Sequence, residues 1–201
     1  MTIRGCLCER NRYWIVLWIS LGILILQGVG SYLSKSLALF SDTAHVFGDF
    51  TAQLVAIRIA DAVYRGIGDE EQLRKRGMWL HAVLLWGAAT WVVIEALGRI
   101  GHPFTVNTPL MMWVTAIGAL GNLAAYLVVR KGEQNVTHLG LSWHVWSDFL
   151  QSLAVLATGG LILMTGISTI DLIAAVLLAG YMSWGGFKIV CVGNGAHAHS
   201  H

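Results

Sequence analysis

Six long apolar stretches occupy most of this chain and restrict the folds it can adopt. A helix needs roughly 20 mostly apolar residues to cross the hydrocarbon core of a bilayer. Every backbone polar group there must be satisfied within the helix, because the core contains no water. We therefore predict an all-α membrane protein, a bundle of six transmembrane helices in a lipid membrane. The predicted helices lie near residues 13–33, 38–61, 77–99, 108–129, 138–165 and 169–191.

Composition supports a membrane location and leaves little of the chain outside the bilayer. Of the 201 residues, 56% are hydrophobic and 12% are charged, and the mean hydropathy is +0.64, far from an average soluble domain. The first apolar stretch lacks a small-residue cleavage site, so we predict a retained helix and not a removed signal peptide. The expected organisation is an N-terminal tail at 1–12, a membrane domain at 13–191 and a histidine-containing tail at 192–201.

The distribution of lysine and arginine predicts the orientation of the helices. Short cytoplasmic loops carry an excess of these residues. Of the 13 positive residues, the following lie on one side of the predicted bundle: Arg4, Arg10, Arg12, Arg65, Arg74, Lys75, Arg76, Arg130, Lys131 and Lys188. We therefore expect both tails in the cytoplasm, and a bacterial inner or plasma membrane as the location. No clustered basic face on a soluble fold is predicted, so nucleic acid is not an expected partner.

Two identical pairs of metal-binding residue types lie inside the predicted helices. His45 with Asp49, and His144 with Asp148, each follow the pattern H-x-x-x-D. A four-residue step places both side chains on one face of a helix, about 6 Å apart along the axis. Ionisable residues inside a membrane are expensive and usually mark a pathway. Two such helices facing each other would supply two imidazoles and two carboxylates, a complete tetrahedral shell for a zinc-like ion.

The charges of this predicted site indicate an exchange of metal for protons. Two ionised aspartates and two neutral histidines carry a formal charge of −2, which a divalent cation balances. Histidine must be neutral to bind a metal, so loading the ion expels protons and unloading admits them. Imidazole with carboxylate suits Zn²⁺, and also Cd²⁺ or Co²⁺, better than Mg²⁺ or Ca²⁺. The chain has no G-x-x-x-x-G-K-[ST] loop, so ATP is not predicted to drive the exchange.

Further polar residues are candidates for accessory roles. Asp42 lies one turn before His45, where it could relay protons, receive ions at the outer mouth of the site, or cap the helix and face water. Asn122 lies among small residues of the predicted fourth helix, where a hydrogen bond between helices is favoured over metal binding.

A second, weaker metal site is conceivable on the cytoplasmic side. Asp69 lies in the expected loop 64–77, and His81 follows in the next predicted helix. An ordinary solvated loop is the favoured interpretation. The C-terminal tail alternates small residues with His197, His199 and His201. This pattern is typical of either a loose metal chelator or a disordered end.

Four segments together resemble a known family, the cation diffusion facilitators, also called zinc transporters. They are SLALFSDTAHVFGD at 36–49, IEALGRI at 94–100, HVWSD at 144–148 and the dipeptide Ile170-Asp171. The resemblance extends from about residue 13 to residue 190. It implies a proton-coupled exporter of divalent metals with six helices, usually a homodimer, and a transport site between the second and fifth helices. Carried over position by position, it implies the ligands His45, Asp49, His144 and Asp148. Histidine at the first position of both pairs resembles the zinc-selective members.

The sequence also departs from the family pattern. Family members typically carry a cytoplasmic C-terminal domain of ferredoxin-like fold, which binds metal and holds the dimer together. This sequence ends shortly after its sixth apolar stretch, so we expect that domain to be missing. A homodimer would then form through the membrane helices.

The leading hypothesis from the sequence is a metal/proton antiporter that exports Zn²⁺, and also Cd²⁺, by alternating access. An intramembrane zinc enzyme is the first rival, but catalytic zinc normally keeps an open coordination position and the chain has no H-E-x-x-H helix. A non-enzymatic role is therefore expected. The second rival is a membrane metal sensor that does not transport, and only a transport measurement distinguishes it from an exporter.

Overall fold

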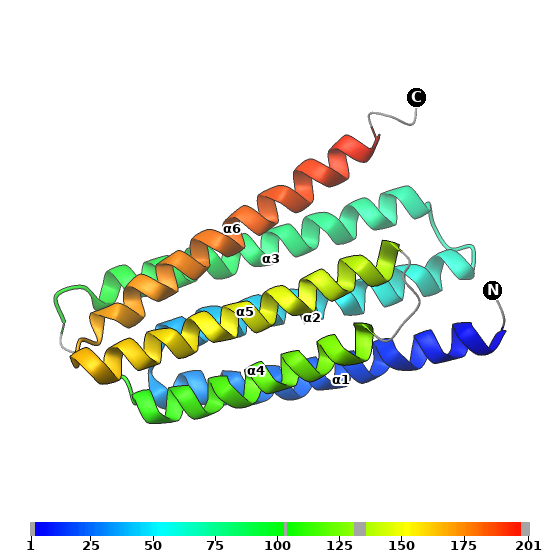
Figure 1. Cartoon of the computed structure of the whole chain (residues 1–201). Coiled ribbons are helices and arrows are strands. Elements are labelled where there is room, and N and C mark those ends of the chain that lie inside the picture. The colour runs from blue at the N-terminus through cyan, green and yellow to red at the C-terminus, as the bar shows by residue number, and fades with distance from the viewer. Residues whose placement is uncertain (1–2, 103, 131–135, 198–201) are drawn as a thin grey trace.

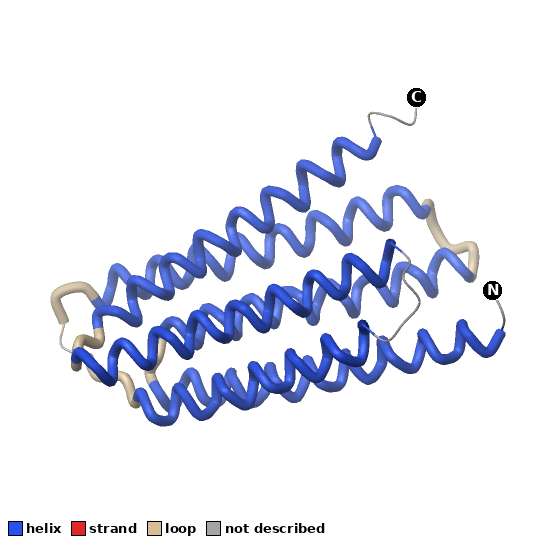
Figure 2. The backbone as a smooth tube through the Cα atoms, in the orientation of Figure 1, coloured by secondary structure: helices blue, strands red, loops and turns tan. Residues whose placement is uncertain are grey.

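The structure is a computed structural model that describes residues 3–102, 104–130 and 136–197. Some side chains within these ranges are not described. They are those at 3–13, 56, 60, 63, 64, 70, 136–144 and 192–197. The described part forms six helices and no strand, which confirms the predicted all-α bundle (Figures 1 and 2). The helices are α1 (Ile3–Ser34), α2 (Leu37–Tyr64), α3 (Glu70–Arg99), α4 (Thr108–Arg130), α5 (Val136–Thr165) and α6 (Thr169–His197).

Five of these helices are long and apolar enough to cross a membrane: α1, α3, α4, α5 and α6. Helix α2 does not meet the same criterion in its described part, and it carries Asp42, Asp49 and Asp61. It nevertheless packs against α1, α3, α5 and α6. Asp42 and Asp49 are buried among these neighbours, which is where a membrane protein places ionisable groups, whereas Asp61 near the end of α2 is exposed.

Several helices extend beyond the apolar stretches that predicted them. Helix α3 begins at Glu70, seven residues before the expected start at 77, so the connection after α2 is shorter than the predicted loop 64–77. Asp69 is the N-cap of α3, and its side chain accepts a hydrogen bond from the backbone N–H of Glu71 at 2.9 Å. Hydropathy cannot detect this start, because the first two turns of α3 are charged and outside an apolar run.

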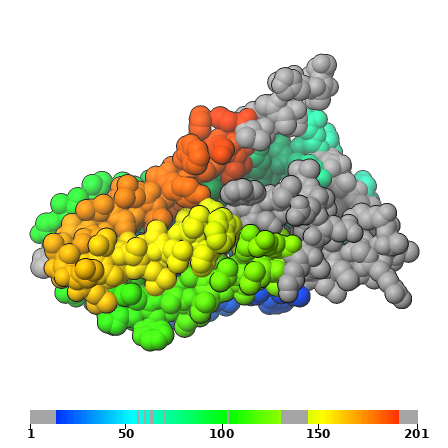
Figure 3. All heavy atoms as spheres, in the orientation of Figure 1, coloured from blue at the N-terminus to red at the C-terminus, as the bar shows by residue number. Residues whose placement is uncertain are grey.

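The surface and the interior of the bundle reflect a lipid environment. Figure 3 shows α4, α5 and α6 side by side on one face. These helices expose large apolar side chains, among them Trp113, Leu120, Met164 and Leu177. In water such a surface would favour aggregation, whereas hydrocarbon chains accept it.

The interior of the bundle holds two apolar clusters and a set of buried polar side chains. The larger cluster includes Leu39, Leu85 and Met111, and the smaller one includes Val16 and Val129. The buried polar side chains include Gln27, Asp42, Asn122, Asp148 and Ser152.

The start of α2 is fixed by a side chain from another helix. Ser36 is the residue before α2, and its Oγ accepts a hydrogen bond from the backbone N–H of Leu39 at 3.1 Å. Asp171, in the first turn of α6, accepts bonds from Ser36 Oγ at 2.6 Å, Leu37 N at 2.6 Å and Ala38 N at 3.3 Å. The backbone N–H groups at a helix start have no partner within the helix. Asp171 therefore caps α2 across a large separation in sequence.

Candidate metal centre

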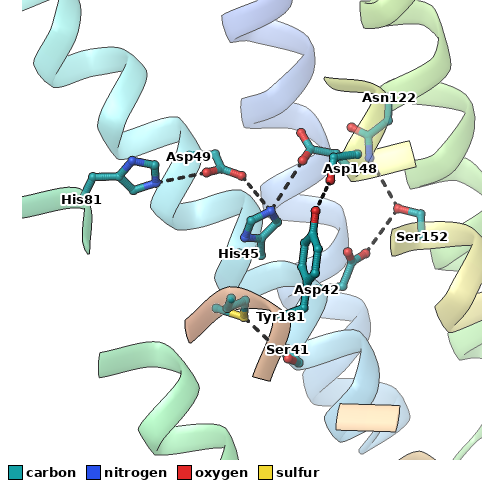
Figure 4. A network of polar contacts seen from close by, with 11 residues as sticks. Ser41, Asp42, His45, Asp49, His81, Asn122, Asp148, Ser152 and Tyr181 are labelled. Atoms are coloured by element: carbon teal, nitrogen blue, oxygen red, sulfur yellow. Dashed lines mark hydrogen bonds and ion pairs between the residues drawn. The ribbon is translucent and has the colours of Figure 1, made fainter. Parts of the chain in front are cut away.

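Three of the four predicted ligands come together between α2 and α5. His45 and Asp49 lie one turn apart on α2, and Asp148 approaches from α5 (Figure 4). His45 Nε2 is 3.2 Å from Asp49 Oδ2 and 3.6 Å from Asp148 Oδ1. One potential ligand atom from each residue lies within 4.8 Å of the others, and all three residues are buried. Among the described residues this is the group of His, Cys, Asp and Glu side chains that could hold a metal ion.

The spacing of these atoms fits tetrahedral coordination. Two ligands of a tetrahedral zinc ion, each about 2.0 to 2.1 Å from the metal, lie roughly 3.3 to 3.4 Å apart. The His45–Asp49 and His45–Asp148 separations of 3.2 and 3.6 Å bracket this value. A small movement of α5 relative to α2 would therefore suffice to close the three groups around a cation.

The fourth predicted ligand, His144, lies on α5 one turn before Asp148. Its side chain lies outside the described residues, so the structure places three of the four predicted ligands. The helical course of α5 through 144–148 agrees with the expected placement of both residues on one face. Ligation by His144 remains a prediction.

Asp42 belongs to a buried hydrogen-bond network next to this centre. Its Oδ2 accepts bonds from Gln27 Nε2 at 2.8 Å and from Ser152 Oγ at 3.3 Å. Asn122 donates to Ser152 Oγ at 3.4 Å, which agrees with the favoured hydrogen bond between helices. Only 1% of Asp42 is exposed, and Ser36 and Asp171 provide the cap of α2. The interpretation of Asp42 as a solvent-facing helix cap is therefore wrong.

A glycine makes room for this network. A Cβ atom at Gly118 would lie 2.7 Å from Gln27 Nε2 and 3.2 Å from its Cδ, so the amide would have to swing away from Asp42. We expect Gly118→Ala to lower the unfolding free energy in detergent by about 1 kcal/mol, the usual range for a hydrogen bond between membrane helices. Thermal unfolding measures this loss.

Gly160→Ala is the matched control for Gly118→Ala, because a Cβ at Gly160 meets nothing within 4 Å. That variant should be neutral or slightly stabilising, since alanine has the higher helix propensity. In a Gln27→Ala background, Gly118→Ala should lose its effect. An equal loss with and without Gln27 would contradict the assigned contact.

A cavity of about 590 Å³ lies beside the candidate metal centre. Its lining includes His45, Asp49, His81, Tyr181 and Lys188. His81, on α3, places its Nε2 3.2 Å from Asp49 Oδ1. The sequence nominated His81 together with Asp69 as part of a second site, but the structure brings His81 to Asp49 and gives Asp69 a capping role at the start of α3. Metal binding by Asp69 stays a prediction.

The tail histidines fall outside the part of the chain whose side chains are described. His197 is the last residue of α6, while His199 and His201 lie beyond the described backbone. Their role as metal chelators remains a prediction.

Sequence reasoning missed two polar contacts at the candidate site. The first is the hydrogen bond that Gln27 on α1 donates to Asp42. The sequence offered one signal for it, a single amide side chain within an apolar stretch. The contact between His81 and Asp49 had no signal in the spacing of residues, because it depends on how α2 and α3 pack.

Comparison with known proteins identifies relatives of this chain. Residues 77–191 match the family described as the cation efflux transmembrane domain. The chain is 32% identical over 164 residues to the metal cation efflux system protein CzcD of Cupriavidus metallidurans, covering 77% of this chain and 51% of that protein. It is 26% identical over 176 residues to the cadmium, cobalt and zinc/H(+)-K(+) antiporter of Bacillus subtilis, covering 84% and 57%.

A third relative is the zinc transporter ZitB of Escherichia coli, which is 26% identical over 168 residues, covering 80% of this chain and 54% of that protein. The chain thus spans about half the length of the curated relatives it matches.

Proposed function

Because this chain belongs to the cation diffusion facilitator family, we propose that it moves divalent metal cations out of the cytoplasm. Zn²⁺ is the proposed main substrate, with Cd²⁺ and Co²⁺ as further candidates. The observation that carries the proposal is the buried cluster of His45, Asp49 and Asp148, with ligand atoms within 4.8 Å of one another. The names of the relatives, which refer to zinc, cadmium and cobalt, support this choice of metals. Membership in a family of transporters argues against the enzymatic alternative.

The proposed transport site consists of His45, Asp49, His144 and Asp148, with protons as the counter-ion. His45 Nε2 faces two carboxylates at 3.2 and 3.6 Å, and this nitrogen holds either a proton or a cation. Arrival of the metal on one side releases protons, and its departure on the other side admits them. The bundle would rock to open the site alternately to the two sides, as in other transporters with a site inside the bundle.

The orientation and the assembly are also proposals. The excess of positive residues favours cytoplasmic tails, and in that orientation metal leaves the cell. A homodimer through the membrane helices is compatible with the exposed apolar faces of α3 and α6, which include Trp91 and Leu177.

Zinc uptake into proteoliposomes tests the proposed function. The purified chain is reconstituted in vesicles that hold a zinc indicator and an acidic interior, and zinc is added outside. We expect saturable zinc uptake coupled to a rise in internal pH, with none in protein-free vesicles. Uptake that leaves the internal pH unchanged would contradict proton exchange, and the absence of any uptake would favour a non-transporting sensor.

Acidification on the loading side should weaken zinc uptake. Protons compete with the cation at the histidine nitrogens, so the apparent KM for zinc should rise by about tenfold per pH unit for each proton displaced, once the site is protonated. Initial uptake rates measured at external pH 6.0, 6.5, 7.0 and 7.5, with the internal pH held constant, check this dependence. A KM that is independent of the loading-side pH would contradict competition at the site.

A further inference from the structure

The carboxylate of Asp49 lies between two imidazoles and not beside one. Its Oδ2 is 3.2 Å from His45 Nε2, and its Oδ1 is 3.2 Å from His81 Nε2 on α3 (Figure 4). Both separations are close to the roughly 3.3 Å expected for two ligands of one tetrahedral zinc ion. Each oxygen of Asp49 therefore lies at the distance of a ligand pair from a different histidine.

His81 is the more accessible of the two histidines. Its side chain is 17% exposed, compared with 10% for His45 and 4% for Asp49. His81 lines the 590 Å³ cavity beside the metal centre. It also lines a second hollow of about 260 Å³ between α2 and α3, which includes Ile59 and Arg74. Ile59 lies near the end of α2 and Arg74 near the start of α3, so this second hollow extends from His81 toward the α2–α3 connection.

We propose that His81 is a further metal ligand, which together with Asp49 receives the cation before it reaches the deeper site. This inference rests on the proposed transport function. The cation first binds His81 Nε2 and Asp49 Oδ1. It then moves to His45 Nε2, Asp49 Oδ2 and the α5 carboxylate of Asp148. Asp49 holds the ion throughout, so the transfer avoids an intermediate with no protein ligand.

The positive charge of Lys188 at the cavity explains why a carboxylate and an imidazole would be needed there to receive a cation. Lys188 also lines the cavity, with its ammonium group 4.9 Å from the centre of the Trp184 ring. A positive charge there disfavours an approaching cation. A carboxylate with an imidazole in the same cavity offsets that repulsion, because the pair supplies both negative charge and a nitrogen ligand.

The competing explanation is that His81 only donates a hydrogen bond that orients Asp49. Three substitutions separate the two roles. His81→Ala removes both the ligand and the donor. His81→Gln restores an N–H donor without a good zinc ligand, and His81→Cys restores a zinc ligand without the ring N–H.

We expect His81→Ala and His81→Gln each to raise the KM for zinc uptake at least about tenfold, because loss of a group that only supports a metal ligand already weakens binding by 10- to 100-fold, with the maximal rate within about twofold. His81→Cys should recover most of the KM and favour Cd²⁺ over Zn²⁺ relative to the wild type, because thiolate is the softer ligand. Recovery with Gln but not with Cys would overturn the proposal in favour of a positioning role. A wild-type KM in His81→Ala would overturn it outright.

A binding measurement keeps this inference separate from the transport function. Calorimetric titration with Zn²⁺ measures the zinc affinity of the detergent-solubilised chain. His81→Ala and His81→Gln should bind zinc more weakly than His81→Cys and the wild type, even if no variant transports. Identical affinities in all four proteins would overturn the ligand role. His102→Ala is the matched control, since His102 is exposed on the connection between α3 and α4, and it should match the wild type. Circular dichroism checks that each variant keeps its helices.

Discussion

Replacing Asp49 with asparagine is expected to reduce zinc transport by at least about 100-fold. Asp49 offers one oxygen to His45 and the other to His81, each at 3.2 Å. Asparagine has nearly the same shape, but it removes one negative charge from a buried centre and replaces an oxygen with an N–H group that cannot bind a metal. Loss of groups that merely support a metal ligand already lowers affinity by 10- to 100-fold. Initial zinc uptake into proteoliposomes measures the effect.

Asp61→Asn is the matched control for Asp49→Asn. Asp61 lies on the same helix, but it is exposed and pairs with Arg65 at 3.1 Å. Exposed ion pairs contribute little to stability, so this variant should transport zinc within about twofold of the wild type. If Asp49→Asn retained transport while its helical content matched the wild type, the assigned site would be wrong.

The four proposed metal ligands could be named from the sequence because their arrangement is local to each helix. The H-x-x-x-D spacing places His45 and Asp49 on one face of any α-helix, whatever surrounds it. The apolar stretches likewise predicted the six helices, five of which are long and apolar enough in their described parts to span a bilayer. Helix boundaries were harder to predict from hydropathy, because α3 begins with charged residues and its start depends on the cap at Asp69.

Contacts between helices could not be predicted in the same way. The approach of His81 to Asp49 depends on the packing of α2 against α3. The environment of Asp42 depends on Gln27 and Ser152, which come from α1 and α5. From the sequence, Asp42 was as compatible with a solvent-facing cap as with a buried role. The three-dimensional packing excludes the cap, because Ser36 and Asp171 already fill that position.

Asp171→Ala should lower the unfolding free energy by about 2 to 3 kcal/mol, because it leaves buried donors without their acceptor. Asp171 is 0% exposed and accepts bonds from Ser36 Oγ and from the N–H groups of Leu37 and Ala38. Its negative charge also faces the positive end of the α2 dipole. Thermal or chemical unfolding of the detergent-solubilised chain measures the loss.

Ser36→Ala tests whether the loss in Asp171→Ala comes from the cap. It removes the hydroxyl that donates to Asp171 and accepts from Leu39 N, yet leaves the two backbone bonds to the carboxylate, so it should cost about 1 kcal/mol. His45 lies about two turns after this cap, so a frayed start of α2 would also displace the metal centre. Asp171→Ala should therefore weaken zinc binding, although the described hydrogen bonds of Asp171 go to Ser36, Leu37 and Ala38 and not to a proposed ligand. A destabilised variant with wild-type zinc affinity would show instead that the cap and the metal centre are energetically independent.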